Sequence, residues 1–230
     1  MNVDKALKER RTVASQASGG ASSEAVYASF VNLLVQLNLS GRLLDFGAGV
    51  GLLIQDLLRL GRFQITGADL MPRPVDLDET VAWIEGDLNE RLDIADDSFD
   101  VIVAAEVIEH LENPRAVARE WFRLLRPCGT LLISTPNNES WRALLALVIR
   151  GHFVLFGDSS YPAHITALVR KDIERVLCET GFAPATFTFT NSGGIPKMPA
   201  FQWQRISKAF KGLRYSDNVI AIARKPEVKG

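Results

Sequence analysis

The chain of 230 residues contains little cysteine and no long apolar run. Its two cysteines, Cys128 and Cys178, form neither a disulfide framework nor a CxxC metal motif, so we expect two reduced thiols in the core. The longest uninterrupted apolar stretch, residues 143–149, is far shorter than the ~20 residues that a helix needs to span a bilayer. Residues 1–20 lack the apolar segment of an export signal. These absences predict a cytoplasmic protein.

The chain also has no excess of charge of either sign, with 26 Lys and Arg against 27 Asp and Glu. Proteins that coat nucleic acids are basic, so DNA is not expected as a partner. Hydrophobic residues make up 47% of the sequence, and glycine and proline occur at ordinary frequencies. This composition excludes a low-complexity chain and favours one large globular domain.

Apolar segments typical of buried strands alternate with amphipathic helical patterns along most of the chain. We expect strands at residues 42–46, 63–68, 81–85, 99–104 and 129–135, followed by an antiparallel pair at 185–190 and 218–223. Parallel strands joined by helices fold as a doubly wound α/β sheet with three layers. The pattern predicts a single domain over residues 24–230 with an insertion at about 193–215, preceded by a flexible polar segment over residues 1–23.

Two helices carry clear boundary signals. Asn113 is a good N-cap residue and Pro114 suits the first helical position, so a helix should begin there. A second helix at about residues 171–180 should stop at Gly181, which suits the left-handed cap position.

The most informative stretch of the sequence is DFGAGVG, residues 45–51. It follows a predicted strand and precedes a predicted helix, so its glycines allow the backbone to turn tightly and approach a ligand at the helix N-terminus. The stretch does not match the dinucleotide pattern GxGxxG, because Leu52 stands where the third glycine is required. The turn therefore predicts a nucleotide-like cofactor other than a dinucleotide.

Three carboxylates, those of Asp45, Asp69 and Asp87, stand at the ends of successive predicted strands. Asp45 suits a ligand with a cationic end and would repel a pyrophosphate. Asp69 stands where a carboxylate accepts hydrogen bonds from both hydroxyls of a ribose, and Asp87 can accept one from an adenine amino group. The three acids together predict a nucleoside that carries a positive charge.

On these residues the chain resembles the class I S-adenosylmethionine-dependent methyltransferases. The resemblance spans roughly residues 40–190 and includes DFGAGVG, Asp69, the GDL of residues 86–88 and the later segment LLRPCGTLLISTPN. It implies a Rossmann-like, seven-stranded, mostly parallel sheet with an antiparallel last strand, and S-adenosylmethionine as the cofactor. The implied cofactor contacts are Asp45, Gly47, Ala48, Gly49, Gly51, Asp69, Leu70, Asp87, Leu88, Ala105 and Glu106.

An ExxEH motif at residues 106–110 follows the fourth predicted strand. Glu106, Glu109 and His110 would share one face of a helical turn and, with His164, could hold a hard divalent ion such as Mg²⁺. Quinone-biosynthesis O-methyltransferases and small-RNA 3′-terminal 2′-O-methyltransferases have a similar motif, and this resemblance implies a metal that lowers the pKa of an acceptor hydroxyl. The alternative is that His110 is only hydrogen-bonded near a helix end and that Glu106 serves the cofactor side.

Two later segments concern the methyl acceptor. The apolar run of residues 141–156 predicts a core helix, a lining for the acceptor pocket, or both. Residues 201–214 predict a basic amphipathic helix, either a lid over the site or a contact with an anionic membrane or a lipid-linked substrate. TPN, GHF-like and HIT segments resemble those of saccharide-modifying methyltransferases.

The sequence therefore predicts an enzyme that methylates a hydroxyl of a small molecule or a saccharide, with His164 as general base or metal ligand. One alternative is a non-catalytic subunit that binds S-adenosylmethionine. The other is an RNA 2′-O-methyltransferase, which the net charge of -1 disfavours. The oligomeric state stays open.

Overall fold

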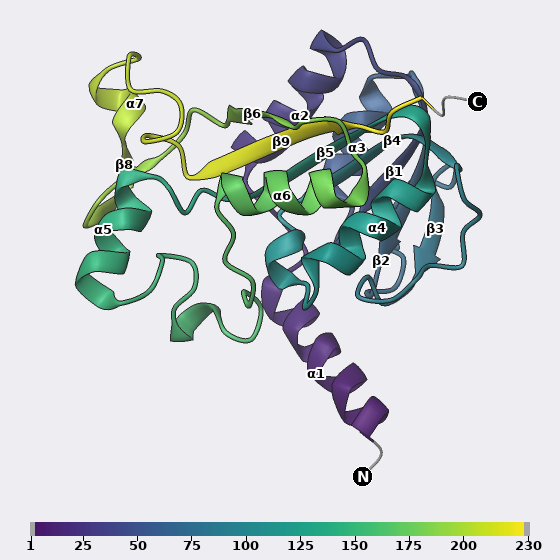
Figure 1. The fold of residues 1–230 in the computed structure, drawn as a ribbon, viewed down its shortest axis with the longest axis horizontal. Helices are drawn as coiled ribbons and strands as arrows, with labels where there is room; N and C mark the ends of the chain where they lie inside the picture. Colours follow the sequence, from purple (N-terminus) through teal and green to yellow (C-terminus); the bar gives the residue numbers. More distant parts are fainter. Residues whose placement is uncertain (1–2, 228–230) are drawn as a thin grey trace.

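The computed structural model describes residues 3–227, which fold around a seven-stranded sheet (Figure 1). Residues 1–2 of the predicted flexible segment and residues 228–230 of the predicted domain lie outside the described residues. The strands of the sheet are β1 Gly41–Phe46, β2 Phe63–Asp69, β3 Ala82–Glu85, β4 Phe99–Ala105, β5 Leu125–Pro136, β6 Thr186–Phe189 and β9 Asn218–Arg224. Their order is β3-β2-β1-β4-β5-β9-β6, and β9 runs antiparallel to both of its neighbours. The predicted mostly parallel sheet with an antiparallel last strand is confirmed.

Helices cover both faces of this sheet (Figure 1). The four that pack on it are α2 Glu24–Gln36, α3 Leu52–Arg59, α4 Pro114–Leu124 and α6 Arg170–Thr180. Phe30 of α2 and Ile54 of α3 belong to one buried apolar layer, whereas Trp121 of α4 and Ile173 of α6 belong to the other. Because strand side chains alternate between the two faces of the sheet, the same strands contribute side chains to both apolar layers. The predicted three-layer doubly wound domain is confirmed.

The order of the strands reverses at β1. This strand pairs with β2 on one side and with β4 on the other, so the two halves of the sheet are wound in opposite directions from it. In open α/β sheets such a reversal opens a crevice at the carboxyl ends of the strands, where ligands bind. The glycine turn follows β1 and the ExxEH motif follows β4, so both lie at this edge.

The helix boundaries that the sequence marked are confirmed. The Oδ1 atom of Asn113 accepts a hydrogen bond of 3.1 Å from the backbone N–H of Ala116, and Pro114 occupies the first turn of α4. Gly181 ends α6 with a φ of 109°, in the left-handed region.

The N-terminal segment is helical where the sequence predicted a flexible chain. Its helix, α1, spans Val3–Ser18 and extends away from the sheet (Figure 1). Arg11 of α1 forms an ion pair of 2.8 Å with Asp87, and the carbonyl oxygen of Gly20 accepts a hydrogen bond of 2.9 Å from Val50. Partners distant in the sequence hold this segment in place, and no local pattern shows them.

Residues 201–214 do not form the predicted basic amphipathic helix. The segment from residue 194 onward contains β7 Gly194–Ile195, β8 Met198–Gln202 and α7 Trp203–Ile206, and β7 and β8 pair as a small separate sheet. The single turn of α7 ends at Ser207, whose backbone is extended. The side-chain amide of Gln204 donates to the carbonyl oxygens of Phe210 and Tyr215 at 2.8 and 2.9 Å. These bonds fold the following residues into a loop in place of a helix.

The predicted core helix at residues 141–156 is also wrong. Its helical part, α5, spans Trp141–Arg150 and lies at one end of the molecule (Figure 1), with only Ala143 and Ala146 buried. A short 3₁₀ helix, η2 Asp158–Ser160, follows it. Within residues 3–227, none of the helices combines the length and the apolar content that crossing a bilayer requires.

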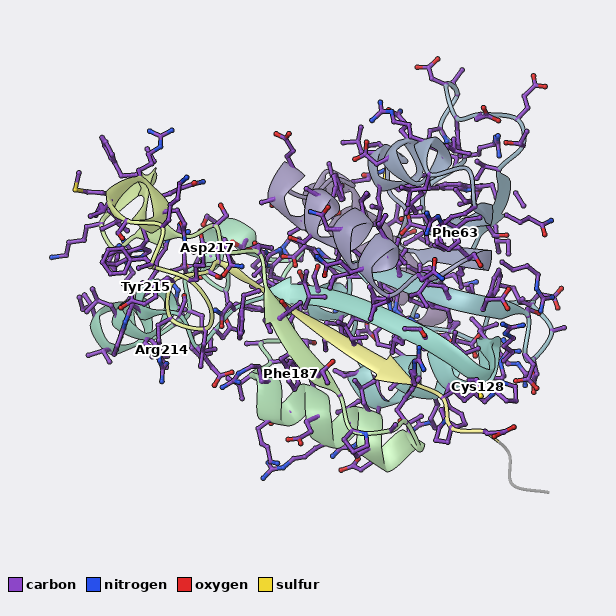
Figure 2. All side chains as sticks on the ribbon, turned by 90° about the horizontal axis from the view of Figure 1, so that it is seen from above. Phe63, Cys128, Phe187, Arg214, Tyr215 and Asp217 are labelled. Atoms are coloured by element: carbon purple, nitrogen blue, oxygen red, sulfur yellow. The ribbon has the colours of Figure 1, made fainter. Side chains whose placement is uncertain are left out.

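Both cysteines are free and exposed, so the prediction of core thiols is wrong. Cys128 has a φ of 64° in the stretch of β5 that precedes its buried part (Figure 2). Cys178 lies on α6, outside the apolar face that Ile173, Val176 and Leu177 form.

Candidate active site

A cavity of about 870 Å³ lies at the carboxyl edge of the sheet, where the strand order reverses. The turn after β1, the end of β2 and the segment after β4 line it, and α1 contributes a further wall. Every predicted cofactor contact except Gly51 lines this cavity, namely Asp45, Gly47, Ala48, Gly49, Asp69, Leu70, Asp87, Leu88, Ala105 and Glu106. The three strand-end acids therefore share one crevice.

The glycine turn is held against both the sheet and the N-terminal segment. The backbone N–H groups of Gly47 and Ala48 donate to the carbonyl oxygen of Ala68 at 2.8 and 3.1 Å. Gly49 has a φ of 52°, and a Cβ atom added there would collide with the carbonyl oxygen of Gly20. Only glycine fits this position, because both the backbone conformation and the space exclude a side chain. Gly51 does not line the cavity, since it is the N-cap residue of α3 with a φ of 80°.

Asp69 ties the end of β2 to the glycine turn. Its Oδ2 atom accepts a hydrogen bond of 2.8 Å from the N–H of Gly49, and its Oδ1 atom accepts one of 2.8 Å from Met71. Burial raises the pKa of this carboxyl, and the backbone N–H groups oppose the rise. Each carboxylate oxygen has a second lone pair, so Asp69 keeps two acceptor positions for a ligand in the cavity.

Asp45 is a buried carboxyl with an unsatisfied oxygen. In the sheet, Asp45 of β1 is paired with Gly67 of β2 and with Val103 of β4. Its Oδ2 atom has no hydrogen-bond partner within residues 3–227. Burial, reinforced by the charge of Asp69, raises its pKa to about 8. A cation bound in the cavity would stabilise the ionised carboxyl, so the unpaired oxygen fits a positively charged ligand.

Asp87 already has partners within the protein. Asn89 donates to its Oδ1 atom from both the backbone and the side-chain nitrogen, and Arg11 donates to its Oδ2 atom at 2.8 Å. Arg11 also forms ion pairs with Glu90 and Glu112, which closes α1 over this side of the cavity. Arg11 was not predicted from the sequence, because it stands in an ordinary charged run with nothing to mark it.

Glu106 belongs to the cavity and not to the predicted metal cluster. Its backbone has a φ of 57° in the left-handed region, which turns the chain as it leaves β4. Its two carboxylate oxygens accept hydrogen bonds of 2.8 Å from Ser134 and Asn218. Burial raises its pKa to about 7, and these two donors oppose the rise. The residues whose ligand atoms lie within 4.8 Å of one another are Glu109, His110 and His164, and Glu106 is not among them.

Glu109 lies in η1 Ile108–His110, a 3₁₀ turn after β4, and is completely buried. Its Oε2 atom accepts a hydrogen bond of 3.0 Å from the hydroxyl of Thr135, whereas its Oε1 atom has no partner in the described part of the chain. Burial, with the charge of Glu106, raises its pKa well above the usual value. An unpaired buried carboxylate oxygen beside a cavity is a candidate for binding a cation or for exchanging a proton.

His110 and His164 lie side by side near Glu109. The backbone N–H groups of Ile165 and Thr166 donate to the carbonyl oxygen of Glu109 at 3.0 and 2.9 Å, which docks the loop that carries His164. The centroids of the two imidazoles are 4.7 Å apart, and burial lowers the pKa of both. One ligand atom from each of Glu109, His110 and His164 lies within 4.8 Å of the others, so three of the four predicted metal ligands come together.

The part of the cavity around His164 is partly apolar. Leu111, Leu155 and Ile165 line it there, and Tyr161 adds an aromatic side chain. Of the predicted pocket lining within residues 141–156, only Arg142 and Leu155 line the cavity.

Comparisons with known proteins agree with this geometry. A methyltransferase domain family matches residues 21–186, which is more than half of the chain. The ubiquinone biosynthesis O-methyltransferase of Xanthomonas oryzae pv. oryzae is 36% identical over 122 residues, which cover 49% of this chain and 51% of that protein. The chain thus matches about half the length of this curated relative.

Solved structures share the fold across almost the whole chain. A SAM dependent methyltransferase from Archaeoglobus fulgidus has a TM-score of 0.62 at 19% identity, covering 90% of this chain and 96% of that one. The 1,6-didemethyltoxoflavin-N1-methyltransferase of Burkholderia thailandensis, solved with bound 1,6-didemethyltoxoflavin and S-adenosylhomocysteine, has a TM-score of 0.63 at 17% identity, covering 99% and 91%. From the family match and the fold together, we conclude that the chain belongs to the methyltransferase domain family, within the class I S-adenosylmethionine-dependent methyltransferases.

Proposed function

We propose that this protein transfers a methyl group from S-adenosylmethionine to a hydroxyl of a small molecule. The observation that carries the proposal is the buried carboxyl of Asp45, which has an unpaired oxygen in the same cavity as the glycine turn and Asp69. A buried carboxyl without a partner costs free energy, and a cationic nucleoside in this cavity would remove that cost.

The residues of the cavity fit the cofactor in three ways. Gly47, Ala48 and Gly49 of the turn line the cavity, and Asp69 keeps two acceptor positions for the ribose hydroxyls. Asp45 and Glu106 would face the cationic part, while Leu70 and Leu88 supply apolar contacts. When bound, S-adenosylmethionine supplies a methyl group on a positively charged sulfur, and this methyl group passes to a nucleophilic oxygen as the carbon–sulfur bond breaks.

In this proposal His164 accepts the proton of the acceptor hydroxyl. It lines the cavity, and its Nδ1 atom is buried with no partner among the described residues. Burial and the neighbouring His110 lower its pKa, which keeps the imidazole neutral and able to act as a base. The hydrogen bond of 2.8 Å between His110 and the carbonyl oxygen of Ala163 holds the adjacent ring in place.

The proposed acceptor is a small molecule with an apolar or aromatic body. The apolar lining near His164, from Leu111, Leu155 and Ile165, suits such a molecule better than a saccharide. The O-methyltransferase named for ubiquinone biosynthesis, which matches about half of the chain, supports a hydroxyl as the acceptor group. A saccharide hydroxyl remains the competing acceptor class in the screen described below.

A second proposal is that the cluster of Glu109, His110 and His164 binds a metal ion. Two imidazoles and one carboxylate, from His110, His164 and Glu109, suit a first-row transition metal better than Mg²⁺, which prefers oxygen ligands. Titration of Mn²⁺, Zn²⁺ and Mg²⁺ into chelator-treated protein tests this directly. We expect binding of Mn²⁺ or Zn²⁺ that Glu109→Gln abolishes, and the absence of binding by all three ions would remove the metal.

The cofactor assignment is tested by calorimetric titration of S-adenosylmethionine. Asp69→Ala should weaken binding by about 100-fold, because it removes two charge-assisted hydrogen bonds to the ribose and loosens the glycine turn. Asp93→Ala, at an exposed position outside the cavity, is the matched control and should bind as wild type does. Equal affinities for the two variants would contradict the assignment.

The catalytic assignment is tested by an acceptor screen of catechols, quinols and sugars, followed by variants of the histidines. With the best acceptor, His164→Ala should lower kcat by about 100-fold and leave the Kd of the cofactor unchanged. His152→Ala is the control, since His152 does not line the cavity. Tight cofactor binding without transfer to any acceptor would instead identify a non-catalytic subunit.

A further inference from the structure

One end of the molecule carries a surface that the proposed chemistry does not use. It is formed by α5, β8, α7 and the loop up to residue 214, and we call it the α5–α7 face. Both views place these elements at the same end, away from β2 and the edge strand β3 (Figures 1 and 2). Two properties of this face, exposed apolar side chains and an excess of basic residues, occur together.

The apolar side chains of the face are unusually exposed. On α5, 83% of the surface of Val148 and 60% of that of Ile149 are accessible to solvent. On the neighbouring segment, Ile206 is 64% exposed, and Met198 and Phe201 are about half exposed. Apolar residues gathered in this way on a water-soluble surface mark an interaction site, because each one forgoes the free energy of burial.

The charge of the same face is entirely positive. Residues 140–157 and 192–216 contain no Asp or Glu, but they contain seven basic residues: Arg142, Arg150, Lys197, Arg205, Lys208, Lys211 and Arg214. The whole chain has a net charge of -1, so the rest of the molecule is strongly acidic by comparison. Apart from Arg142, which pairs with Asp217 at 3.0 Å, the side chains of these basic residues make no salt bridge among the described residues.

Direct contacts join the two segments into one surface. The backbone N–H of Trp141 donates to the carbonyl oxygen of Arg214 at 3.0 Å, and the guanidinium of Arg214 lies 5.2 Å from the centre of the Trp141 ring. Figure 2 shows Arg214, Tyr215 and Asp217 at this junction. The N-terminal end of α5 and the end of the loop after α7 therefore lie side by side.

We propose that the α5–α7 face docks on the surface of an anionic lipid bilayer. Exposed aliphatic and aromatic side chains enter the boundary between headgroups and acyl chains, and Lys and Arg side chains bind anionic headgroups. A single-stranded RNA would use the basic residues but would leave Val148 and Ile149 in water. A bilayer with anionic headgroups uses both properties at once.

This surface borders the mouth of the cavity. Arg142 of α5 and Gln202 of β8 line the cavity, although their elements belong to the α5–α7 face. A bilayer on this face would therefore bring an acceptor dissolved in the membrane close to His164. This consequence rests on the proposed function, whereas the docking itself does not.

The test is co-sedimentation of the full chain with lipid vesicles, without cofactor or acceptor. Vesicles of phosphatidylcholine mixed with phosphatidylglycerol should bind the protein, and vesicles of phosphatidylcholine alone should bind it much more weakly. Lys208→Gln combined with Lys211→Gln should weaken binding roughly twenty-five-fold, since each basic residue near the surface contributes about a factor of five. Arg119→Gln combined with Arg175→Gln, which removes two exposed charges from α4 and α6, should have no such effect.

The apolar part of the proposal has its own pair of variants. Val148→Asp combined with Ile149→Asp should abolish vesicle binding, whereas Val75→Asp, at an almost fully exposed position on the loop between β2 and β3, should not. Circular dichroism and thermal unfolding establish that each variant is folded, and both positions lie outside the core.

Three outcomes would overturn the proposal. The first is equal binding to neutral and anionic vesicles, or to neither. The second is salt-dependent binding of single-stranded RNA in a filter assay by a protein that ignores vesicles, which would assign the face to nucleic acid. The third is a wild-type dimer that Val148→Asp converts to a monomer in the absence of lipid. A failure to find methyl transfer bears on the proposed function and leaves this test unaffected.

Discussion

The cavity at the carboxyl edge of the sheet and the α5–α7 face have opposite chemistry within one chain of net charge -1. The cavity holds buried acids, with Asp45, Glu106 and Glu109 all desolvated and all with raised pKa values. The face holds exposed basic and apolar side chains, and residues 140–157 and 192–216 contain no Asp or Glu. A chain with a net charge near zero therefore contains two regions of opposite charge. The cavity suits a cationic ligand, and the face suits an anionic partner.

The two regions also differ in what holds their side chains. In the cavity, hydrogen bonds within the protein position several of the acids, as the N–H groups of Gly49 and Met71 do for Asp69 and the side chains of Ser134 and Asn218 do for Glu106. On the face, side chains such as Val148 and Lys208 stand free in solvent on locally formed elements. Substitutions in the cavity should therefore disturb both binding and stability, whereas those on the face should change association alone.

The largest expected effect comes from breaking the cavity at Gly49. Gly49→Ala places a Cβ against the carbonyl oxygen of Gly20 and should weaken binding of S-adenosylmethionine by about 100-fold, because the turn shifts away from the ligand. Calorimetry measures this loss, and vesicle binding by the α5–α7 face should not change.

Gly61→Ala is the matched control for that substitution. Gly61 also has a positive φ, of 63°, but a Cβ there would meet nothing within 4 Å. Gly61→Ala should lower the free energy of unfolding by about 1 kcal/mol through backbone strain and leave the affinity for S-adenosylmethionine unchanged. Similar losses of affinity in both variants would show that strain, not the close approach to Gly20, explains the effect.

A smaller effect, which sharpens the electrostatic side of the comparison, is expected from Asp45. In the free protein its pKa is about 8, so binding a cation must displace a proton at neutral pH. The affinity of the wild-type protein for S-adenosylmethionine should therefore rise between pH 6 and pH 8. Asp45→Asn should keep only the smaller rise that Glu106, with a pKa of about 7, contributes, and it should bind about tenfold more weakly at pH 8. An undiminished pH dependence in Asp45→Asn would assign the proton to another group.

The same carboxyl predicts the direction of stability with pH. Because the folded-state pKa of Asp45 exceeds its usual value of 3.8, the folded protein binds more protons than the unfolded chain between those two pH values. This contribution to stability is complete below pH 3.8 and is lost as the pH rises toward about 8. Asp45→Asn should thus gain stability relative to wild type from pH 5 to pH 8, as measured by urea unfolding at each pH.

The smallest effect in this series is expected at Arg11, the cation that closes α1 over the acidic cavity. Arg11→Met removes the ion pairs with Asp87, Glu90 and Glu112 and should weaken cofactor binding about fivefold at low salt. Since salt screens these pairs, the difference from wild type should shrink as salt is added. Hydrogen exchange of α1 should become faster, and Lys8→Met on the exposed side of the helix is the control. Unchanged exchange in Arg11→Met would show that packing holds α1 in place.

The parts of the fold that the sequence predicted are those with a local physical cause. Asn113 and Pro114 begin α4 and Gly181 ends α6 because capping needs only neighbouring residues. The strands were predictable because a buried parallel strand is apolar on both faces. The 201–214 helix was not a correct prediction, since the side chain of Gln204 folds that loop with bonds that a helical pattern does not reveal.

The site divides in the same way. By itself, the sequence determined which edge of the sheet carries the cavity, because a glycine turn and strand-end acids must meet where parallel strands end. Tertiary structure alone decided that Glu106 turns toward Ser134 and Asn218, that Arg11 reaches Asp87, and that an acid-free apolar face forms from two separate segments. These are contacts between residues far apart in the chain, and their free energy arises only when folding brings the partners together.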